Sequence, residues 1–338
     1  MRYEFRKLIF RREVFVLALI FLGVLVFLCV QSDFRAPDSA WDEICYQEFT
    51  AFQETELPAL VQSFKENSET GSTAYIRTDY QKAFDCYNAK LSFRPYDTLA
   101  ARQVLSLLEF TPARVLFILL VLAFLCPLFT QETEHQMIPL LMTARHGARR
   151  LFRRKMLTAF LSVLVLSFLY TITGALSLWL YAKLPLSALA APVRSLINLH
   201  YCPFALSIGG YLLFLSFCRA LAVLPAVALI FLLSVFPLHH LAVLGITSAA
   251  SGSLIALSGV SEYAHWVFKQ LGLFELLTTE QYFTTYETVN VLGVPVFRIT
   301  LAILFTVLFA ATIIAYAAAL ALRPERSTSL ETRVSSSQ

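Results

Sequence analysis

The chain has 338 residues, of which 57% are hydrophobic and 15% charged, and its formal net charge at pH 7 is +4. An ordinary soluble domain carries about a quarter of its residues as charges, so this composition excludes a soluble globular enzyme. The apolar residues gather into blocks long enough to cross a bilayer, whereas residues 31–112 have the composition of a water-soluble domain. The sequence therefore predicts a polytopic membrane protein with one sizeable insertion.

The N-terminal segment 1–13 is basic and amphipathic. It places apolar residues on one helical face and basic residues around the rest, which is typical of a helix lying in the inner membrane interface. A simple positively charged flank of the first span is an equally good interpretation. The apolar block 14–31 is not followed by a small-residue cleavage site, so we expect a retained first span rather than a signal peptide.

The insertion 32–112 has apolar residues at helical spacing, with breaks near residues 67–72 and at Pro95. This pattern predicts two or three amphipathic helices in a small extracytoplasmic domain. Residues 31–112 hold thirteen acidic and seven basic residues, a balance that does not favour nucleic-acid binding.

Two of the six cysteines, Cys45 and Cys86, lie in this predicted outer domain, and the other four lie in apolar blocks. Cys45 and Cys86 are a candidate disulfide, which in the chain-entropy model would stabilise the domain by roughly 4 kcal/mol. The alternative is that both are unpaired core cysteines.

The remaining apolar blocks predict five further spans. Arg219 is the only charge between two of them, so we expect a tight helical hairpin that turns there. Residues 238–260 are apolar but rich in glycine and serine, which favours a re-entrant or broken segment within an outer region 238–298. The five predicted spans are residues 113–130, 157–181, 199–218, 220–237 and 299–322.

Arginine and lysine in short loops set the orientation. The N-terminus and the loop 131–156 are strongly basic, so both are predicted to be cytoplasmic. With six spans, Arg219 and a disordered tail 323–338 fall on the same side. A seventh span at 238–260 would put the arginine-bearing tail outside. We therefore expect an all-α, multi-pass protein of the cell membrane with six spans and both termini in the cytoplasm.

Several kinds of chemistry are not indicated by the sequence. No predicted span carries a charge in its interior, which disfavours proton-coupled transport and ion channels. There is no phosphate-binding glycine loop for ATP, so the chain is not expected to be an ATPase or another enzyme. His239 and His240 could bind a metal, but interfacial polar residues are the more common case and we predict no metal site. Ser251 and Ser253 have no base in a neighbouring span and more simply permit close helix packing.

The most informative segment is the loop 131–156. Acidic residues follow the end of the second span, and a short apolar segment predicted to be a helix comes next. Arginines that recur every four residues then precede the third span. This basic stripe would face lipid phosphates or an acidic partner. In chain order the residues are Glu132, Glu134, Met137, Leu140, Leu141, Thr143, Arg145, Arg149, Arg150 and Lys155.

This order resembles the cytoplasmic loop of permease subunits of type 2 ABC transporters, in the subset with an outer domain between the first two spans. The resemblance implies that the loop is a coupling helix that docks on a separate ATP-binding subunit. It assigns the contact to Glu132, Glu134, Met137, Leu140, Leu141 and Thr143, and anchoring at the membrane or partner to Arg145, Arg149, Arg150 and Lys155. The family often has a proline and a serine after this helix, where the chain has Ala144, Arg145 and His146.

The resemblance further implies an exporter subunit that pairs with itself or with a similar permease. This chain would bind no cofactor, because ATP and Mg²⁺ belong to the partner ATPase. Uncharged spans suit an apolar or amphiphilic cargo such as a lipid, peptide or drug-like molecule. The outer segment 281–290 could gate the exit or form an aromatic belt. Two alternatives remain: a membrane sensor or scaffold that uses the acidic outer domain, and an intramembrane enzyme acting on lipid through Ser253 or a histidine.

Overall fold

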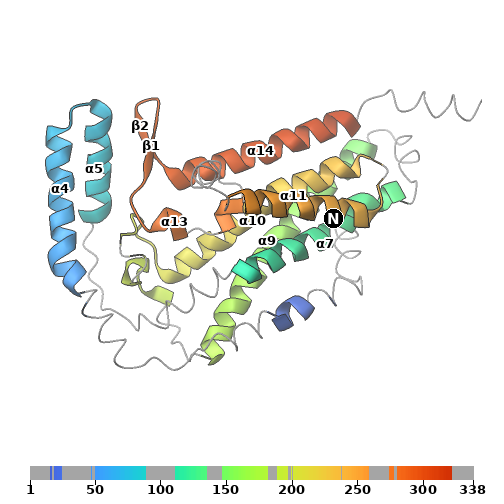
Figure 1. The fold of residues 1–338 in the computed structure, drawn as a ribbon, viewed down its shortest axis with the longest axis horizontal. Helices are drawn as coiled ribbons and strands as arrows, with labels where there is room; N and C mark the ends of the chain where they lie inside the picture. The colour runs from blue at the N-terminus through green and yellow to red at the C-terminus, as the bar shows by residue number, and fades with distance from the viewer. Residues whose placement is uncertain are drawn as a thin grey trace, which may run out of the picture.

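The computed structural model describes residues 16, 19–24, 47, 50–88, 111–134, 147–181, 189–196, 199, 201–236, 238–258, 274–277 and 280–321. These residues are mostly helical, and several of the helices are long and apolar (Figure 1). The prediction of a mainly helical chain with helices able to cross a membrane is therefore confirmed. It missed a short β-hairpin, so the fold is not strictly all-α.

Four helices in the described part of the chain are long and apolar enough to cross a membrane. They lie in α9 (Gly147–Tyr181), α10 (Ile208–Ser234), α11 (His240–Ser258) and α14 (Arg298–Ala321). A shorter apolar stretch, Arg114–Thr130, lies in α7 (Thr111–Glu134).

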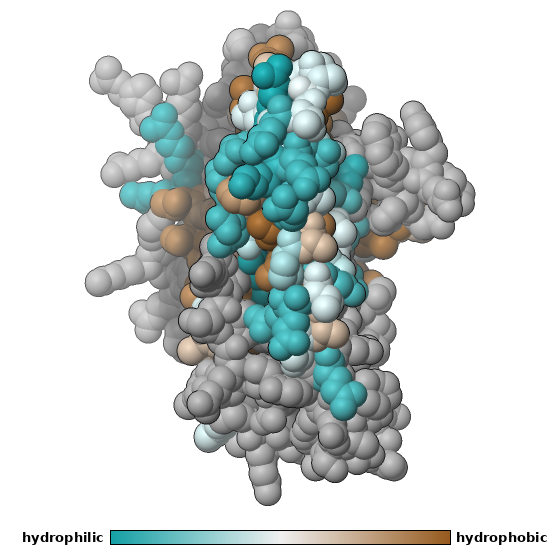
Figure 2. All heavy atoms as spheres, turned by 90° about the vertical axis from the view of Figure 1, so that its left-hand side faces the viewer, coloured by the Kyte–Doolittle hydropathy of each residue, from teal (hydrophilic) through white to brown (hydrophobic). Residues whose placement is uncertain are grey.

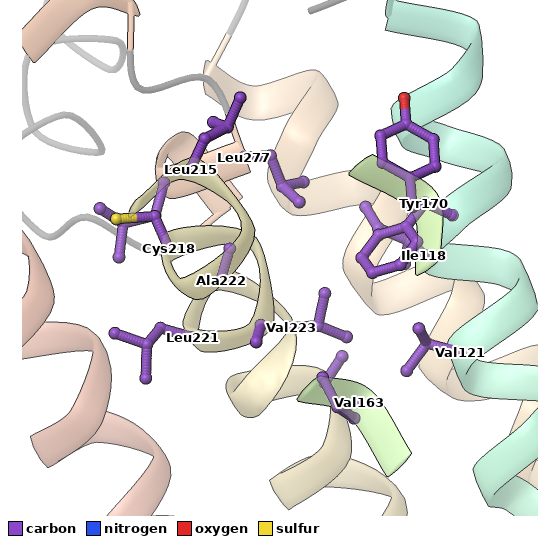
Figure 3. Close-up of a cluster of buried hydrophobic side chains, with 14 of the residues drawn as sticks. Ile118, Val121, Val163, Tyr170, Leu215, Cys218, Leu221, Ala222, Val223 and Leu277 are labelled. Atoms are coloured by element: carbon purple, nitrogen blue, oxygen red, sulfur yellow. The ribbon is translucent and has the colours of Figure 1, made fainter. Parts of the chain in front are cut away.

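Helix α10 is the centre of the bundle and contacts α7, α9, α11 and α14. Its first turn is capped by Ser207, whose hydroxyl accepts a hydrogen bond from the main-chain nitrogen of Gly210 at 3.1 Å. Figure 3 shows the buried α10 side chain Val223 on the side of the helix where Ile118 of α7 and Val163 of α9 lie, with Leu221 on the opposite side of α10. Close packing of these side chains holds the bundle core together, because helices surrounded by lipid associate through van der Waals contacts and interhelical hydrogen bonds.

The hairpin predicted to turn at Arg219 is wrong. Helix α10 continues through this position without a break. An arginine alone does not terminate a helix, and the neighbouring residues Cys218 and Ala220 do not favour a turn. The side chain of Arg219 is 1% exposed, and its guanidinium lies 4.7 Å from the ring centroid of Tyr170 in α9. The expectation that no span has an internal charge is therefore wrong as well.

Residues 238–260 also differ from the prediction of a broken segment. Helix α11 is continuous from His240 to Ser258 and passes through both of its glycines, Gly245 and Gly252. A Cβ atom at either glycine would meet no atom within 4 Å, so these residues are not needed for close approach within the chain. The glycine and serine content lowers helix propensity without ending the helix.

A helical hairpin consists of α4 (Leu57–Thr70) and α5 (Ala74–Asn88), which we call the outer helices after the location that the sequence predicts for them. A π-helical turn, Phe52–Glu56, leads directly into α4. The break expected near residues 67–72 falls where α4 ends and α5 begins. Phe64 of α4 packs on Tyr80 and Tyr87 of α5, with centroid distances of 6.1 and 5.6 Å. Figure 2 faces these helices and shows a largely hydrophilic surface, as expected for a unit in contact with water.

The β-hairpin joins β1 (Thr288–Val291) to β2 (Val294–Phe297) through a two-residue turn and continues directly into α14. Leu292 and Gly293 in the turn have positive φ angles of 52° and 87°. This is the type I′ geometry that suits the twist of two paired strands. Short helical turns lie at Val193–Ser195, Phe274–Leu277 (η5) and Glu280–Phe283 (α13).

The continuous α10 makes a testable prediction about Cys218. In a variant whose only cysteine is Cys218, a membrane-impermeant maleimide should not label the folded protein from either side, because the thiol is buried at the middle of the helix. The matched variant carries Phe236→Cys as its only cysteine, at an exposed position just beyond α10, and should react. Rapid labelling of Cys218 without denaturant would instead indicate a turn at Arg219.

Candidate functional site

The structure describes only part of the predicted coupling loop. Glu132 and Glu134 lie in the last turn of α7, and Arg149 and Arg150 lie in the first turn of α9. Lys155 lies one turn further along α9 and is buried. Helices α7 and α9 contact each other, so the loop joins two neighbouring helices. Met137, Leu140, Leu141, Thr143 and Arg145 lie outside the described residues, and their roles stay predictions.

The contacts with the clearest geometry lie where three segments meet: the end of α5, the segment before α10 (residues 189–196, 199 and 201–207) and the β-hairpin. The segment before α10 folds back on itself, since the main-chain nitrogen of Val193 donates to the oxygen of Leu206 and that of Ile208 donates to the oxygen of Ala191, both at 2.8 Å. This closure fixes the short helical turn that carries Arg194.

Arg194 joins α5 to the segment before α10. Its Nε donates to the main-chain oxygen of Cys202 and its Nη2 donates to that of Cys86, each at 2.7 Å. The last carbonyls of a helix have no partner within the helix, and the negative end of the helix dipole favours a cation, so this arginine caps α5. Its guanidinium also lies 5.0 Å from the ring centroid of Tyr87. Burial lowers the pKa of Arg194, but a guanidinium keeps its charge at neutral pH.

Two tyrosines extend this junction. The hydroxyl of Tyr87 donates to the main-chain oxygen of Tyr201, and the hydroxyl of Tyr201 donates to Oε2 of Glu56 at 2.6 Å. The ring of Tyr201 meets that of Phe52 edge to face, at a centroid distance of 5.0 Å. Burial raises the pKa of Tyr87, and the hydrogen bond to Glu56 raises that of Tyr201, so both remain neutral donors at physiological pH. We call Cys86, Tyr87, Arg194, Tyr201 and Cys202 the Arg194 junction.

The β-hairpin docks on α5 through Asp79 and Lys82, one to two turns before the Arg194 junction. Oδ1 of Asp79 accepts hydrogen bonds from the hydroxyls of Tyr286 at 2.9 Å and Thr288 at 2.6 Å. Nζ of Lys82 donates to the main-chain oxygen of Pro295 at 2.9 Å and lies 4.2 Å from the ring centroid of Phe297. Burial, and then the bond to Asp79, raise the pKa of Tyr286. These contacts attach α5 to the strands that lead into α14.

At the level of the bundle, a line of hydroxyls joins α9 to α10. Oγ of Ser167 donates to the main-chain oxygen of Ser216, and Oγ of Ser216 donates to Oγ1 of Thr171, both at 2.6 Å. Arg219 lies one turn beyond Ser216, against Tyr170. This polar seam fixes how the two helices meet in a region that is otherwise apolar.

The described residues contain no group of three or more side chains suited to hold a metal ion. His239 and His240 stack on each other at a centroid distance of 4.1 Å, at the start of α11. Cys86 carries a free thiol, while Cys45 lies outside the described residues, so their predicted pairing is untested. The contacts of Arg194, Asp79 and Lys82 described above suit a mechanical connection between the outer helices and the bundle.

Comparison with known proteins gives no relative for this chain: no protein-family model, characterised protein or solved structure matches it.

Sequence reasoning missed the Arg194 junction. Arg194 is one of two basic residues in the region 182–198 and has no motif around it. The available signal was an arginine in an apolar segment next to an aromatic and cysteine pair, Tyr201 and Cys202. That signal does not show which helix end the guanidinium caps.

The geometry predicts the effect of removing this arginine. Arg194→Ala should lower the free energy of unfolding by about 3 kcal/mol, because two inward carbonyls lose a charged donor. Arg194→Lys should lower it by roughly half as much, since an ammonium does not reproduce the two-pronged fork. Thermal unfolding of the purified protein in detergent measures both. The control is Arg77→Ala on the exposed face of α5, which should change stability by less than about 0.5 kcal/mol. Equal losses for Arg194→Ala and Arg77→Ala would contradict the capping role.

Proposed function

We propose that this chain is a transmembrane permease subunit of an ATP-driven ABC exporter. The observation that carries the proposal is the sequence of the loop between α7 and α9, in which acidic residues, the pair Leu140 and Leu141 in a predicted short helix, and a basic run occur in the order that resembles a coupling helix. Its two flanking helices are neighbours, which is compatible with a loop that presents a short helix to a cytoplasmic partner. A separate subunit binds ATP and Mg²⁺, and this chain supplies the pathway.

The helix boundaries support a topology with six spans, although these spans are not the same six that the sequence predicts. In this proposal the spans are the block 14–31, α7, α9, α10, α11 and α14. If successive spans cross the membrane in opposite directions, the outer helices, the segment before α10 and the β-hairpin all lie on the same side of the membrane. Those three parts are the ones joined by Arg194, Asp79 and Lys82. The basic loop between α7 and α9 and both termini fall on the opposite, cytoplasmic side, in agreement with the positive-inside rule.

The buried Arg219 is a charge within a span, but it does not argue against an apolar or amphiphilic cargo. Its side chain is enclosed by the bundle, so the surfaces that α10, α11 and α14 present outward remain apolar. Leu213, Leu241 and Leu304 are among the exposed side chains of these helices. We propose that two permease subunits, identical or similar, pair within the bilayer and pass an apolar or amphiphilic cargo between them.

The topology is tested by two cysteines that should be labelled from opposite sides. A cysteine at Leu292, which is fully exposed at the hairpin tip, should react with an impermeant maleimide added to intact cells. A cysteine at Ser335 in the C-terminal tail should react only after the membrane is opened. Labelling of both in intact cells, or of neither, would contradict the six-span arrangement.

The function is tested by what copurifies with the tagged protein from its native membrane in mild detergent. The wild type should bring down a stoichiometric subunit with a phosphate-binding glycine loop. The double variant Leu140→Asp, Leu141→Asp should lose at least nine-tenths of it, because charged side chains would disrupt an apolar docking surface.

The matched control adds two aspartates to an exposed face of α4, as Ala59→Asp with Ser63→Asp, and should retain the ATPase. Absence of any ATPase from the wild type would overturn the permease proposal and favour a sensor that uses the hydrophilic surface of the outer helices (Figure 2).

A further inference from the structure

Two thiols lie at the Arg194 junction, one on each of the segments that it joins. Cys86 is half-buried near the end of α5, and Cys202 is fully buried in the segment before α10. They are 116 positions apart in the chain, yet the structure brings them to the same arginine. Neither thiol has a role in the connection described above, which uses only the main-chain oxygens of the two residues.

The hydrogen bonds of Arg194 set the spacing of the two cysteines. Nε and Nη2 lie on the same edge of the guanidinium, the edge that binds the two oxygens of one carboxylate. Because that edge contacts the oxygens of Cys202 and Cys86, each at 2.7 Å, the two carbonyl groups lie side by side. The adjacent residues are also joined, since the hydroxyl of Tyr87 donates to the oxygen of Tyr201. The main chain at the end of α5 therefore lies close to the main chain of the segment before α10 at Cys86 and Cys202.

Both thiols are free in the structure, and that of Cys202 lies 3.6 Å from the main-chain oxygen of Phe204. We propose that under oxidising conditions Cys86 and Cys202 form a disulfide that locks the outer helices to the segment before α10. This pairing replaces the Cys45–Cys86 pairing expected from the sequence. It requires the junction to lie on the oxidising side of the membrane, as the six-span topology places it, and it does not require an ATPase partner.

The oxidant is a disulfide-bonded thiol oxidoreductase or a small disulfide such as oxidised glutathione. The thiolate of Cys86, the more accessible thiol, attacks one sulfur of the donor and displaces the other as a thiolate, which gives a mixed disulfide. The thiolate of Cys202 then attacks the sulfur of Cys86 and displaces the second donor sulfur as a thiolate, so that the donor ends as a dithiol or, for glutathione, as two separate thiols. The two protein thiols lose two electrons and two protons, and the donor gains them.

The surroundings make this reaction slow but selective. Burial raises the pKa of Cys86, although the charges of Arg194 and Lys82 oppose the rise. Burial raises the pKa of Cys202 to about 11, so its thiolate is scarce at neutral pH. Reduced protein should therefore close the bond several-fold faster at pH 9 than at pH 7, because the thiolate is the attacking species.

The test begins with native membranes dissolved at once in a denaturing detergent that contains N-ethylmaleimide, so that buried free thiols such as that of Cys202 are blocked as well. Non-reducing digestion and mass spectrometry should recover most of Cys86 as a peptide linked to Cys202, and reduction should release it. A Cys45→Ser variant is the matched control and should give the same linked peptide. Cys86→Ser and Cys202→Ser should each abolish it. Recovery of a Cys45–Cys86 peptide, or of Cys86 and Cys202 both carrying maleimide, would overturn the proposal.

Oxidised glutathione added to the purified, reduced protein shows whether a missing disulfide is due to the wrong side of the membrane or to the wrong geometry of the two cysteines. A Cys86–Cys202 bond that forms only after this addition would contradict the outer placement while leaving the contact intact. No bond after the addition would contradict the geometry itself. Neither result alters the outcome of the ATPase copurification, so failure here is distinct from failure of the permease proposal.

Discussion

The buried guanidinium of Arg194 fixes how the outer helices attach to the rest of the molecule. A helix that ends against other protein must satisfy its last carbonyls, and α5 does so with Arg194 from a segment more than a hundred residues later in the chain. The same fork satisfies a carbonyl of the segment before α10, so one cation joins two main chains. The tyrosine contacts then follow, since Tyr87 and Tyr201 can meet only when that register is set.

The junction has consequences for the bundle because its parts lead directly into apolar helices. The segment that carries Arg194 continues into α10, and the β-hairpin held by Asp79 and Lys82 continues into α14. Within the bundle, the hydroxyl line between Ser216 and Thr171 ties α10 to α9. A movement of α9, whose first turn follows the proposed coupling loop, would therefore reach the outer helices through α10. This linkage is what a permease needs if ATP binding on one side is to open a path on the other.

The sequence predicted the features that depend on composition and periodicity. The membrane class, the helical character, and the two outer helices with their break near residues 67–72 follow from apolar spacing alone. It misjudged features that depend on tertiary contacts. The sequence predicts a turn at Arg219 because it is the only charge between two apolar blocks, whereas the structure keeps the helix continuous and buries Arg219 against Tyr170. The hairpin turn was missed because it places Leu292, a residue with no turn preference, at positive φ. The Arg194 junction joins distant segments and leaves no local pattern.

The central claim is that the outer helices are fixed to the bundle rather than tethered loosely to it. Spin labels at Ser63→Cys on α4 and Leu213→Cys on the exposed side of α10, with the native cysteines replaced by serine, test it through the distance distribution measured by pulsed dipolar spectroscopy. The account predicts a single narrow distribution in the wild-type background and a broad one when Arg194 is replaced by alanine. A broad or multiple distribution with Arg194 present would contradict it.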